Sequence, residues 1–289
     1  MKKLHIAIKT KTKVTQKLET LYDVSYYTEQ TFFEKLLLKE KKYPDIYFHQ
    51  GVLNNDALDL AEHSKTIIVN TNYIKDKILD KKSYIGADKI EVVYPYTVTS
   101  IEYDKQIKKD FRAKYEIKKN EVILFFTGKD LIASGLDKFL EIVTNLENKN
   151  FKAVILTDTT QSEKLRIKLE KSKILKKIII LEECNNIDEL FIASDIFILP
   201  TKQKLFTPNM LKAMHYKNAV FINRDNSSSE LIDAFSLIIG DGDHSVPFKV
   251  DALLGNNKEL KTIQKENYLV VKNLNFDSYI ESLVRIIDN

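Results

Sequence analysis

Residues 121–128 read EVILFFTG, a continuous apolar run that ends in glycine. Runs of this kind are typical of strands that are buried on both faces of a parallel sheet. The stretch 136–146 follows with a helical period, because its apolar residues are Leu136, Phe139, Leu140, Val143 and Leu146. A buried strand followed by an amphipathic helix indicates the first part of a βαβ unit.

The same alternation continues toward the C-terminus. Further short strands are expected at 151–157, 178–181, 196–200, 219–223 and 237–239. Helices are expected at 162–171, 187–193, 209–216 and 227–234, and the rest of the chain reads as helices that end with 277–287. Strands separated by helices in this way predict a parallel sheet with helices on both faces.

The N-terminal part is a less regular α/β region. Strands are expected at 5–8, 23–27, 45–49, 66–70 and 89–94, and helices at 32–39, 58–63 and 72–80. The polar segment 95–110 contains the expected linker. A chain of 289 residues suits two domains. We expect a reduced N-terminal domain at 1–108 and a C-terminal α/β domain at 109–289, whose last helix packs back on the N-terminal domain.

Composition points to a folded protein of a reducing compartment. Hydrophobic residues make up 44% and charged residues 30%, which is ordinary for a soluble globular protein. No run approaches the roughly 18–20 apolar residues of a membrane span, and residues 4–8 are too short for a signal-peptide core. The single cysteine, Cys184, excludes an internal disulfide and fits a cytoplasmic location. Five scattered histidines argue against a zinc site.

Residues 1–17 hold six lysines and no acid. Such a patch could meet phosphates, an anionic membrane or nucleic acid, but a solvated lysine-rich face is the favoured interpretation. Nucleic acid is disfavoured because the net charge is only +4 and no nucleic-acid module occurs. The chain also has only seven glycines and neither G-x-G-x-x-G nor a P-loop, which disfavours a dinucleotide oxidoreductase or an NTPase.

Strings in the chain resemble the signatures of glycosyltransferase family 4, the group 1 glycosyltransferases. GKDLIASGLDKFLEIVTNL at 128–146 is similar to the opening of the family's nucleotide-sugar domain. NIDELFIASDIFILPTKQKLFTPNMLKAMHYKNAVFINRDNSSSEL at 186–231 resembles the second signature, and IIVNTNYIKDKIL at 67–79 with KIEVVYPYTV at 89–98 resembles the elements before the linker. The resemblance covers roughly residues 64–289. It implies the GT-B fold, two Rossmann-like α/β domains facing a cleft, here with a reduced N-terminal domain.

The resemblance implies sugar transfer from a nucleoside-diphosphate donor with retention of configuration. Cationic side chains and a helix N-terminus stabilise the departing diphosphate in that family, so neither a metal nor a cofactor is implied. The implied substrate-binding positions on this chain are Gly128, Ser134, Glu183, Phe206, Thr207 and Lys212. The implied catalytic positions are Lys129, Lys204 and His49.

Several of these positions depart from the family's pattern. Lys129 stands in place of an arginine and keeps the charge without the planar fork. Ser134 replaces a lysine, and Thr207 replaces a glycine. The two glutamates of the Glu-x7-Glu motif fall on Lys204 and Lys212, so the motif is degenerate. A lysine cannot accept the ribose hydrogen bonds that a carboxylate accepts.

Two interpretations therefore stay open. In the first, lysines 129, 204 and 212 converge on the diphosphate in a divergent glycosyltransferase of hexosyltransferase type. In the second, the protein is a catalytically inactive partner or scaffold of an active glycosyltransferase. The acceptor, whether a glycan, a lipid-linked molecule or a protein, is not readable. A lipid-phosphate acceptor would suit the basic N-terminus and a peripheral position at the inner membrane face.

Further residues carry a functional and a structural interpretation side by side. His49 ends an expected strand, where a side chain points toward the ligand crevice, yet a half-buried structural histidine fits equally. Glu182 and Glu183 fall where the family's base-binding loop lies, with solvated loop acids as the alternative. Ser227 and Glu230 predict a capping box at the start of a helix.

Overall fold

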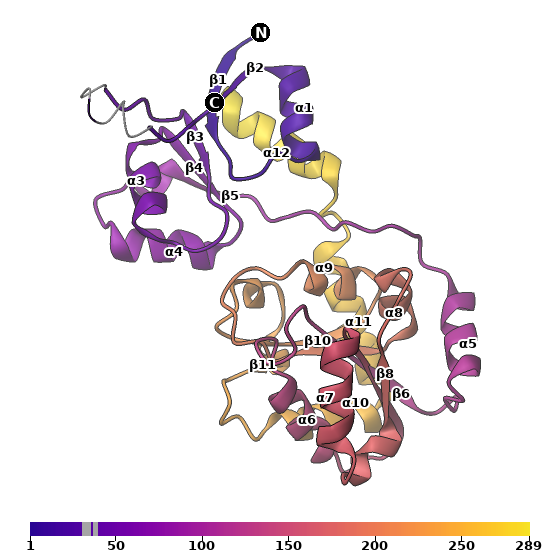
Figure 1. Ribbon diagram of the computed structural model, residues 1–289. Coiled ribbons are helices and arrows are strands. Elements are labelled where there is room, and N and C mark those ends of the chain that lie inside the picture. Colours follow the sequence, from indigo (N-terminus) through magenta and orange to yellow (C-terminus); the bar gives the residue numbers. More distant parts are fainter. Residues whose placement is uncertain (31–35, 37–39) are drawn as a thin grey trace. The chain divides into compact units, whose positions relative to one another are not determined.

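The computed structural model describes residues 1–30, 36 and 40–289, and it divides the chain into two compact units (Figure 1). Unit 1 comprises Met1–Tyr96 together with Phe276–Asn289, and unit 2 comprises Thr97–Asn275. The chain therefore passes from one unit to the other twice. The helix expected at 32–39 lies, apart from residue 36, outside the described residues.

Unit 1 is built on a parallel sheet with the strand order β2-β1-β3-β4-β5. The five segments expected from the sequence form these strands, with bounds that differ by at most two residues at each end. The strands are β1 (Lys3–Ala7), β2 (Asp23–Tyr26), β3 (Ile46–Phe48), β4 (Thr66–Val69) and β5 (Ile90–Val92). The helices are α1 (Lys13–Leu21), α3 (Asn55–His63), α4 (Asn72–Lys81) and the short 3-10 helix η1 (Ala87–Lys89).

Helices pack against the unit 1 sheet in two separate apolar clusters. Helices α3 and α4 contribute Ala61 and Ile78 to one cluster. The other cluster holds α1 together with the C-terminal helix α12 (Phe276–Asp288). The buried residues of α12, Ile280, Leu283 and Ile287, recur at helical spacing and pack with strand residues such as Leu4 and Ile6. The last helix of the chain thus completes the core that the first strand begins.

Unit 2 contains a six-stranded parallel sheet with the order β11-β10-β9-β6-β7-β8. This is the order of a doubly wound Rossmann sheet, whose direction of winding reverses between β6 and β9. Strands β6 and β7 end level with each other, because Thr127 pairs with Leu156. The strands are β6 (Val122–Thr127), β7 (Phe151–Leu156), β8 (Ile178–Leu181), β9 (Ile196–Leu199), β10 (Ala219–Asn223) and β11 (Leu237–Ile238).

Most helices of unit 2 lie where the apolar periodicity predicts them. They are α6 (Leu136–Thr144), α7 (Thr159–Leu169), α8 (Ile187–Ala193), α9 (Pro208–His215), α10 (Val246–Gly255) and α11 (Asn257–Val271), with the 3-10 helices η2 (Lys173–Lys177) and η4 (Ala234–Ser236). Helix α5 (Lys105–Lys114) begins inside the polar segment 95–110, which contains the expected linker, and packs on α8. Among the described helices, none is long and apolar enough to cross a membrane.

The expectation of a helix with a capping box at 227–234 is wrong. Residues Ser227–Leu231 form only a short 3-10 helix, η3, and its cap is Asn226, whose side chain accepts from the Ser228 N–H. The Ser227 hydroxyl is buried and has no hydrogen-bond partner among the described residues. Asn226 is the cap in place of Ser227 because its side-chain amide also donates to the Gln203 and Leu205 carbonyls. These hydrogen bonds connect the turn to the loop before α9.

Gly135 is the cap at the start of α6, where the backbone is left-handed and the Pro200 carbonyl leaves no room for a Cβ. Its φ is 91°, and a Cβ there would lie 2.1 Å from the Pro200 carbonyl oxygen. The left-handed conformation alone costs roughly 1–2 kcal/mol for an L-residue. We expect Gly135→Ala to lower the free energy of unfolding by about 2 kcal/mol or more, measured by urea unfolding. Gly242→Ala is the control, since a Cβ at Gly242 meets nothing within 4 Å. Equal stability of the two variants would contradict the prediction.

Candidate functional site

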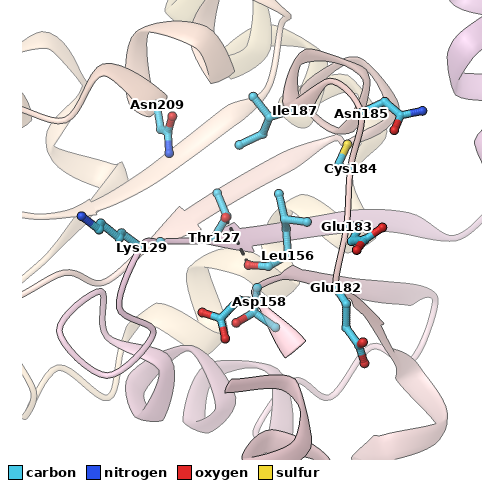
Figure 2. A pocket seen from close by; sticks show the side chains of 12 residues that line it. Thr127, Lys129, Leu156, Asp158, Glu182, Glu183, Cys184, Asn185, Ile187 and Asn209 are labelled. Carbon is cyan, nitrogen blue, oxygen red and sulfur yellow. Dashed lines mark hydrogen bonds between the residues drawn. The ribbon is translucent and has the colours of Figure 1, made fainter. Parts of the chain in front are cut away.

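A cavity of about 710 Å³ opens at the carboxyl ends of β6, β7 and β8 in unit 2 (Figure 2). The loop before α8 and the first turn of α9 complete its wall. Open parallel sheets bind their ligands at this edge, beside the point where the strand order reverses. The lining residues are Thr127, Gly128, Lys129, Leu156, Thr157, Asp158, Glu182, Glu183, Cys184, Asn185, Ile187 and Asn209.

The loop after β6 depends on a close contact between Gly128 and Ser134. A Cβ on Gly128 would lie 1.9 Å from the Ser134 Oγ, so a larger residue at 128 would displace the buried serine. The Ser134 N–H donates to the Asp130 carbonyl, which closes the loop. Gly128 therefore lines the cavity, whereas Ser134 supports the loop from behind.

Lys129 and Asn209 bring polar groups to one side of the cavity, as Figure 2 shows. The Lys129 ammonium forms no ion pair or hydrogen bond with the described residues. Its backbone carbonyl accepts from Gln161 Nε2 at 3.1 Å, which fixes the main chain. The Asn209 amide is half buried at the second position of α9 and also has no partner in the described structure. A cation and an amide are thus free to bind a ligand.

Three acids stand around the opposite part of the cavity, and two of them are engaged. Asp158 caps α7 through the Gln161 N–H, and hydrogen bonds from Gln161 hold the pKa of Asp158 below its usual range. Hydrogen bonds from Ser162 and Arg166 likewise lower the pKa of Glu182. Glu183 is exposed and has no partner among the described residues. Its carboxylate is therefore available to a ligand.

Cys184 and Asn186 shape the loop before α8. The Cys184 thiol lies 3.0 Å from the Asn186 carbonyl, and burial raises the pKa of the thiol, so the neutral form is favoured. Asn186 caps α8 by accepting from the Asp188 N–H at 3.0 Å. In the described part of the chain, no three His, Cys, Asp or Glu side chains are grouped to hold a metal ion.

Lys212 lies outside the cavity lining because it is paired inside the protein. Its Nζ is 2.6 Å from Oδ1 of Asp188, which is fully buried. The other carboxylate oxygen accepts from the Ser100 N–H at 2.6 Å, the Ser100 hydroxyl at 2.8 Å and the Tyr216 hydroxyl at 3.1 Å. We call Asp188, Lys212, Ser100 and Tyr216 the Asp188 network. Burial alone would raise the pKa of Asp188, but these hydrogen bonds outweigh it and lower the pKa.

The loop before α9 carries the remaining expected positions away from the cavity lining. The Lys204 carbonyl accepts from the Ser227 N–H, and the Lys204 side chain is exposed. Phe206 packs partly buried against the unit 2 core. The Thr207 N–H donates to the Ser228 hydroxyl at 2.8 Å. Of the three lysines that the sequence analysis expected to converge, Lys129 alone is among the residues that line the described cavity.

His49 belongs to unit 1, whereas every lining residue of the cavity belongs to unit 2. It follows β3 directly and is buried, with Nδ1 2.9 Å from the Tyr47 hydroxyl. Its Nε2 has no partner among the described residues. Burial lowers the pKa of His49 from the ordinary 6.5, so the neutral ring is favoured in the folded protein.

This lowered pKa predicts a pH dependence. The unfolded chain protonates His49 near 6.5 while the folded chain resists, so stability falls as the pH drops below 6.5 toward the folded pKa. We expect His49→Gln to lose less unfolding free energy than the wild type between about pH 7 and pH 5, because glutamine does not titrate. Urea unfolding at both values measures it. Parallel losses in the two proteins would contradict the expectation.

Several lining residues were missed by sequence reasoning. Thr127 and Thr157 follow the apolar runs of β6 and β7, and a polar residue at the carboxyl end of a parallel strand was the available signal. Asp158 caps α7 and Asn209 lies in the first turn of α9. The available signal for both was a polar residue at the start of a helix that follows a strand. Asp188 gave no signal, because its partners come from two distant segments, around Ser100 and along α9.

A Rossmann-ordered parallel sheet with a cavity beside its reversal point is typical of α/β proteins that bind nucleotides. The family model for glycosyl transferases group 1 matches residues 107–270, more than half of the chain. The chain therefore belongs to the glycosyl transferases group 1 family. Among curated proteins, no sequence matches it.

Solved structures show the same architecture at low sequence identity. Alr3699/HepE from Anabaena, in complex with UDP, covers 100% of both chains with a TM-score of 0.76 and 11% identity. The match with a glycosyltransferase from Rickettsia africae spans 94% of this chain and 78% of the other, with a TM-score of 0.72 and 16% identity. The match with WaaG, a glycosyltransferase involved in lipopolysaccharide biosynthesis, spans 92% of this chain and 86% of the other, with a TM-score of 0.65 and 13% identity. The fold is therefore GT-B, with a parallel α/β sheet in each unit.

Proposed function

We propose that the protein transfers a hexose from a nucleoside-diphosphate donor to an acceptor, with retention of configuration and without a metal. The observation that carries the proposal is the cavity at the reversal point of the unit 2 sheet, with the unpaired Lys129 ammonium at its wall. Family membership supports transferase chemistry. The HepE structures with UDP and with UDP-glucose support a nucleotide-sugar as the donor class.

In this mechanism the bond between the sugar and the donor's terminal phosphate breaks, and negative charge grows on the departing diphosphate. We propose that Lys129 stabilises that charge electrostatically, which lowers the barrier more than it stabilises the bound donor. The Asn209 amide can both donate to and accept from the donor's hydroxyl groups. Glu183 is placed to accept hydrogen bonds from a polar ring edge or a hydroxyl group. These roles need neither Lys204 nor Lys212 in the cavity.

Calorimetric titration with uridine, guanosine, adenosine and thymidine diphosphate sugars tests this proposal, followed by an assay for donor hydrolysis. We expect binding of one donor class in the micromolar range and slow release of the sugar to water. Failure of all donors to bind would overturn the enzyme proposal. It would favour the alternative of an inactive partner or scaffold of an active glycosyltransferase, which co-purification with such an enzyme would then test.

The acceptor side is proposed to be a glycan, a lipid-linked molecule or a protein, met in the cytoplasm or at the inner membrane face. The lysines at the N-terminus support a phosphate-bearing acceptor, although the structure engages two of them. The Lys2 ammonium donates to the Ile287 carbonyl at 2.5 Å, and Lys11 lies 3.5 Å from Glu19 and over the Tyr26 ring. Binding to anionic vesicles that is lost in high salt would support this placement.

A further inference from the structure

Four lysines lie along one face of α11 and its C-terminal cap, and they have no partner among the described residues. At 100° per residue, Lys258, Lys261, Lys265 and Lys272 fall within about 60° of arc and span about 21 Å. All four are exposed, and Lys272 continues the helical backbone as the C-terminal cap. Within the described structure, their ammonium groups form neither ion pairs nor hydrogen bonds. We call this row the α11 lysine stripe.

The surface beside the stripe is apolar and also basic. A second cavity, of about 380 Å³, is lined by Lys217, Lys261, Gln264, Lys265, Tyr268 and Leu269, and no acid lines it. The Lys217 ammonium lies 5.2 Å from the centre of the Tyr268 ring and 5.3 Å from that of Tyr103. Leu269 is 45% exposed and flanks the stripe.

The stripe carries an electrostatic cost that the folded chain does not offset. Lysines at spacings of three and four residues repel each other along a helix, as Lys258, Lys261 and Lys265 do. Lys258 also stands in the first turn, where the helix dipole disfavours a cation. The acids of α11, Glu259 and Glu266, lie about 140–160° around the helix from Lys261, on the far side of Leu269. An external anion is therefore the complement that this face lacks.

We propose that the α11 lysine stripe and Leu269 dock unit 2 onto an anionic phospholipid bilayer. A straight row of point charges without a fixed hydrogen-bond geometry suits a fluid layer of phosphates. Clusters of four or more lysines on a helix favour such surfaces, and the exposed leucine supplies apolar contact at the headgroup boundary. This docking does not rest on the proposed transfer reaction, since it needs neither donor nor acceptor.

Co-sedimentation of the full chain with vesicles measures the docking. We expect binding to equal parts of phosphatidylcholine and phosphatidylglycerol, weak binding to phosphatidylcholine alone, and loss of binding in high salt. Each lysine near the surface is worth about fivefold in partitioning, so Lys261→Gln, Lys265→Gln and Lys272→Gln together should weaken binding about a hundredfold. The matched control is the triple glutamine variant of Lys164 on α7, Lys171 after it and Lys173 at the start of η2, which changes the net charge equally. These three lysines are exposed and have no partner in the described part of the chain.

A fluorescent probe tests the contact itself, because the chain contains no tryptophan. We expect the emission of the Leu269→Trp variant to shift to the blue when anionic vesicles are added. Ile167→Trp, on α7 and 74% exposed in the wild type, should show no shift.

Three results would overturn the proposal. The first is equal binding to the neutral and the anionic vesicles. The second is an equal loss of binding in the control triple variant, or the whole loss in a triple variant of the N-terminal Lys3, Lys9 and Lys13. The third is an unshifted spectrum for Leu269→Trp on vesicles that bind the protein, which would point instead to a soluble acidic partner for this face.

Discussion

Asp188→Ala is expected to lower the free energy of unfolding by about 3–5 kcal/mol, because it leaves the Lys212 ammonium without its buried counter-ion. The carboxylate is fully buried and accepts from four donors, so its removal also leaves the Ser100 N–H without its acceptor. The Tyr216 hydroxyl keeps the Ile101 carbonyl, 2.6 Å away, as an acceptor. Urea unfolding monitored by circular dichroism measures the change. Asp188→Asn should retain part of the stability, since the amide oxygen still accepts hydrogen bonds.

An exposed pair of the same geometry is the matched control for this prediction. Lys202 and Asp241 are also 2.6 Å apart, but their side chains are 65% and 64% exposed. Asp241→Ala should leave the unfolding midpoint nearly unchanged, because water screens and replaces the lost interaction. If the two alanine variants were equally stable, burial would not be the source of the effect.

The Asp188 network also has a defined pH range. Its folded pKa lies below the ordinary 3.8, so the carboxylate stabilises the fold fully above that value. The contribution is lost as the pH falls below 3.8 and through the folded pKa.

Lys212→Glu, which restores the residue type of the resembled motif, is expected to destabilise the fold at neutral pH by placing a second carboxylate against Asp188. Adding Asp188→Asn to that variant should recover part of the loss.

Lys129→Ala is expected to lower kcat/KM for the donor by about 10²–10³, the usual effect of losing one group that stabilises developing charge. The Lys129 ammonium has no partner among the residues that the structure describes, so the unfolding free energy should change little. Lys129→Arg should recover most of the activity, because it keeps the cation. Calorimetry and donor hydrolysis separate binding from catalysis.

Lys164→Ala serves as the control for Lys129→Ala, because Lys164 is exposed on α7 and does not line the cavity. It removes one positive charge from the same unit. An equal fall in kcat/KM for both variants would show a long-range charge effect instead of a contact with the donor. Unchanged activity in Lys129→Ala would remove this residue from the mechanism.

Strand positions were predictable because most of the strands are short apolar runs with polar or glycine neighbours. The run EVILFFTG, for example, becomes β6 with almost the expected bounds. Two helices were not predicted. Helix α1 lies within a lysine-rich segment, and its buried Val14 and Leu18 give a weak apolar period. Helix α5 contains no buried residue, so a polar linker and a polar helix look alike in the sequence.

The site was predictable only in part because its chemistry depends on tertiary partners. Gly128, Lys129 and Glu183 follow strand ends and reach the cavity by topology alone. Lys212 has the sequence position of a donor-binding residue, but its ammonium forms an ion pair with Asp188 of another helix. No local pattern marks such a pairing, since Ser100, Asp188 and Lys212 are far apart in the chain.

The division of unit 1 between the two ends of the chain has a consequence for biosynthesis. Residues 1–96 leave the ribosome before unit 2, yet their core lacks Ile280, Leu283 and Ile287 until the segment 276–289 has been made. Unit 2 is continuous and can fold while that segment is still being translated. The segment that precedes unit 2 in the chain is therefore completed after unit 2, because until then its five-stranded sheet lacks the helix that buries Leu4 and Ile6.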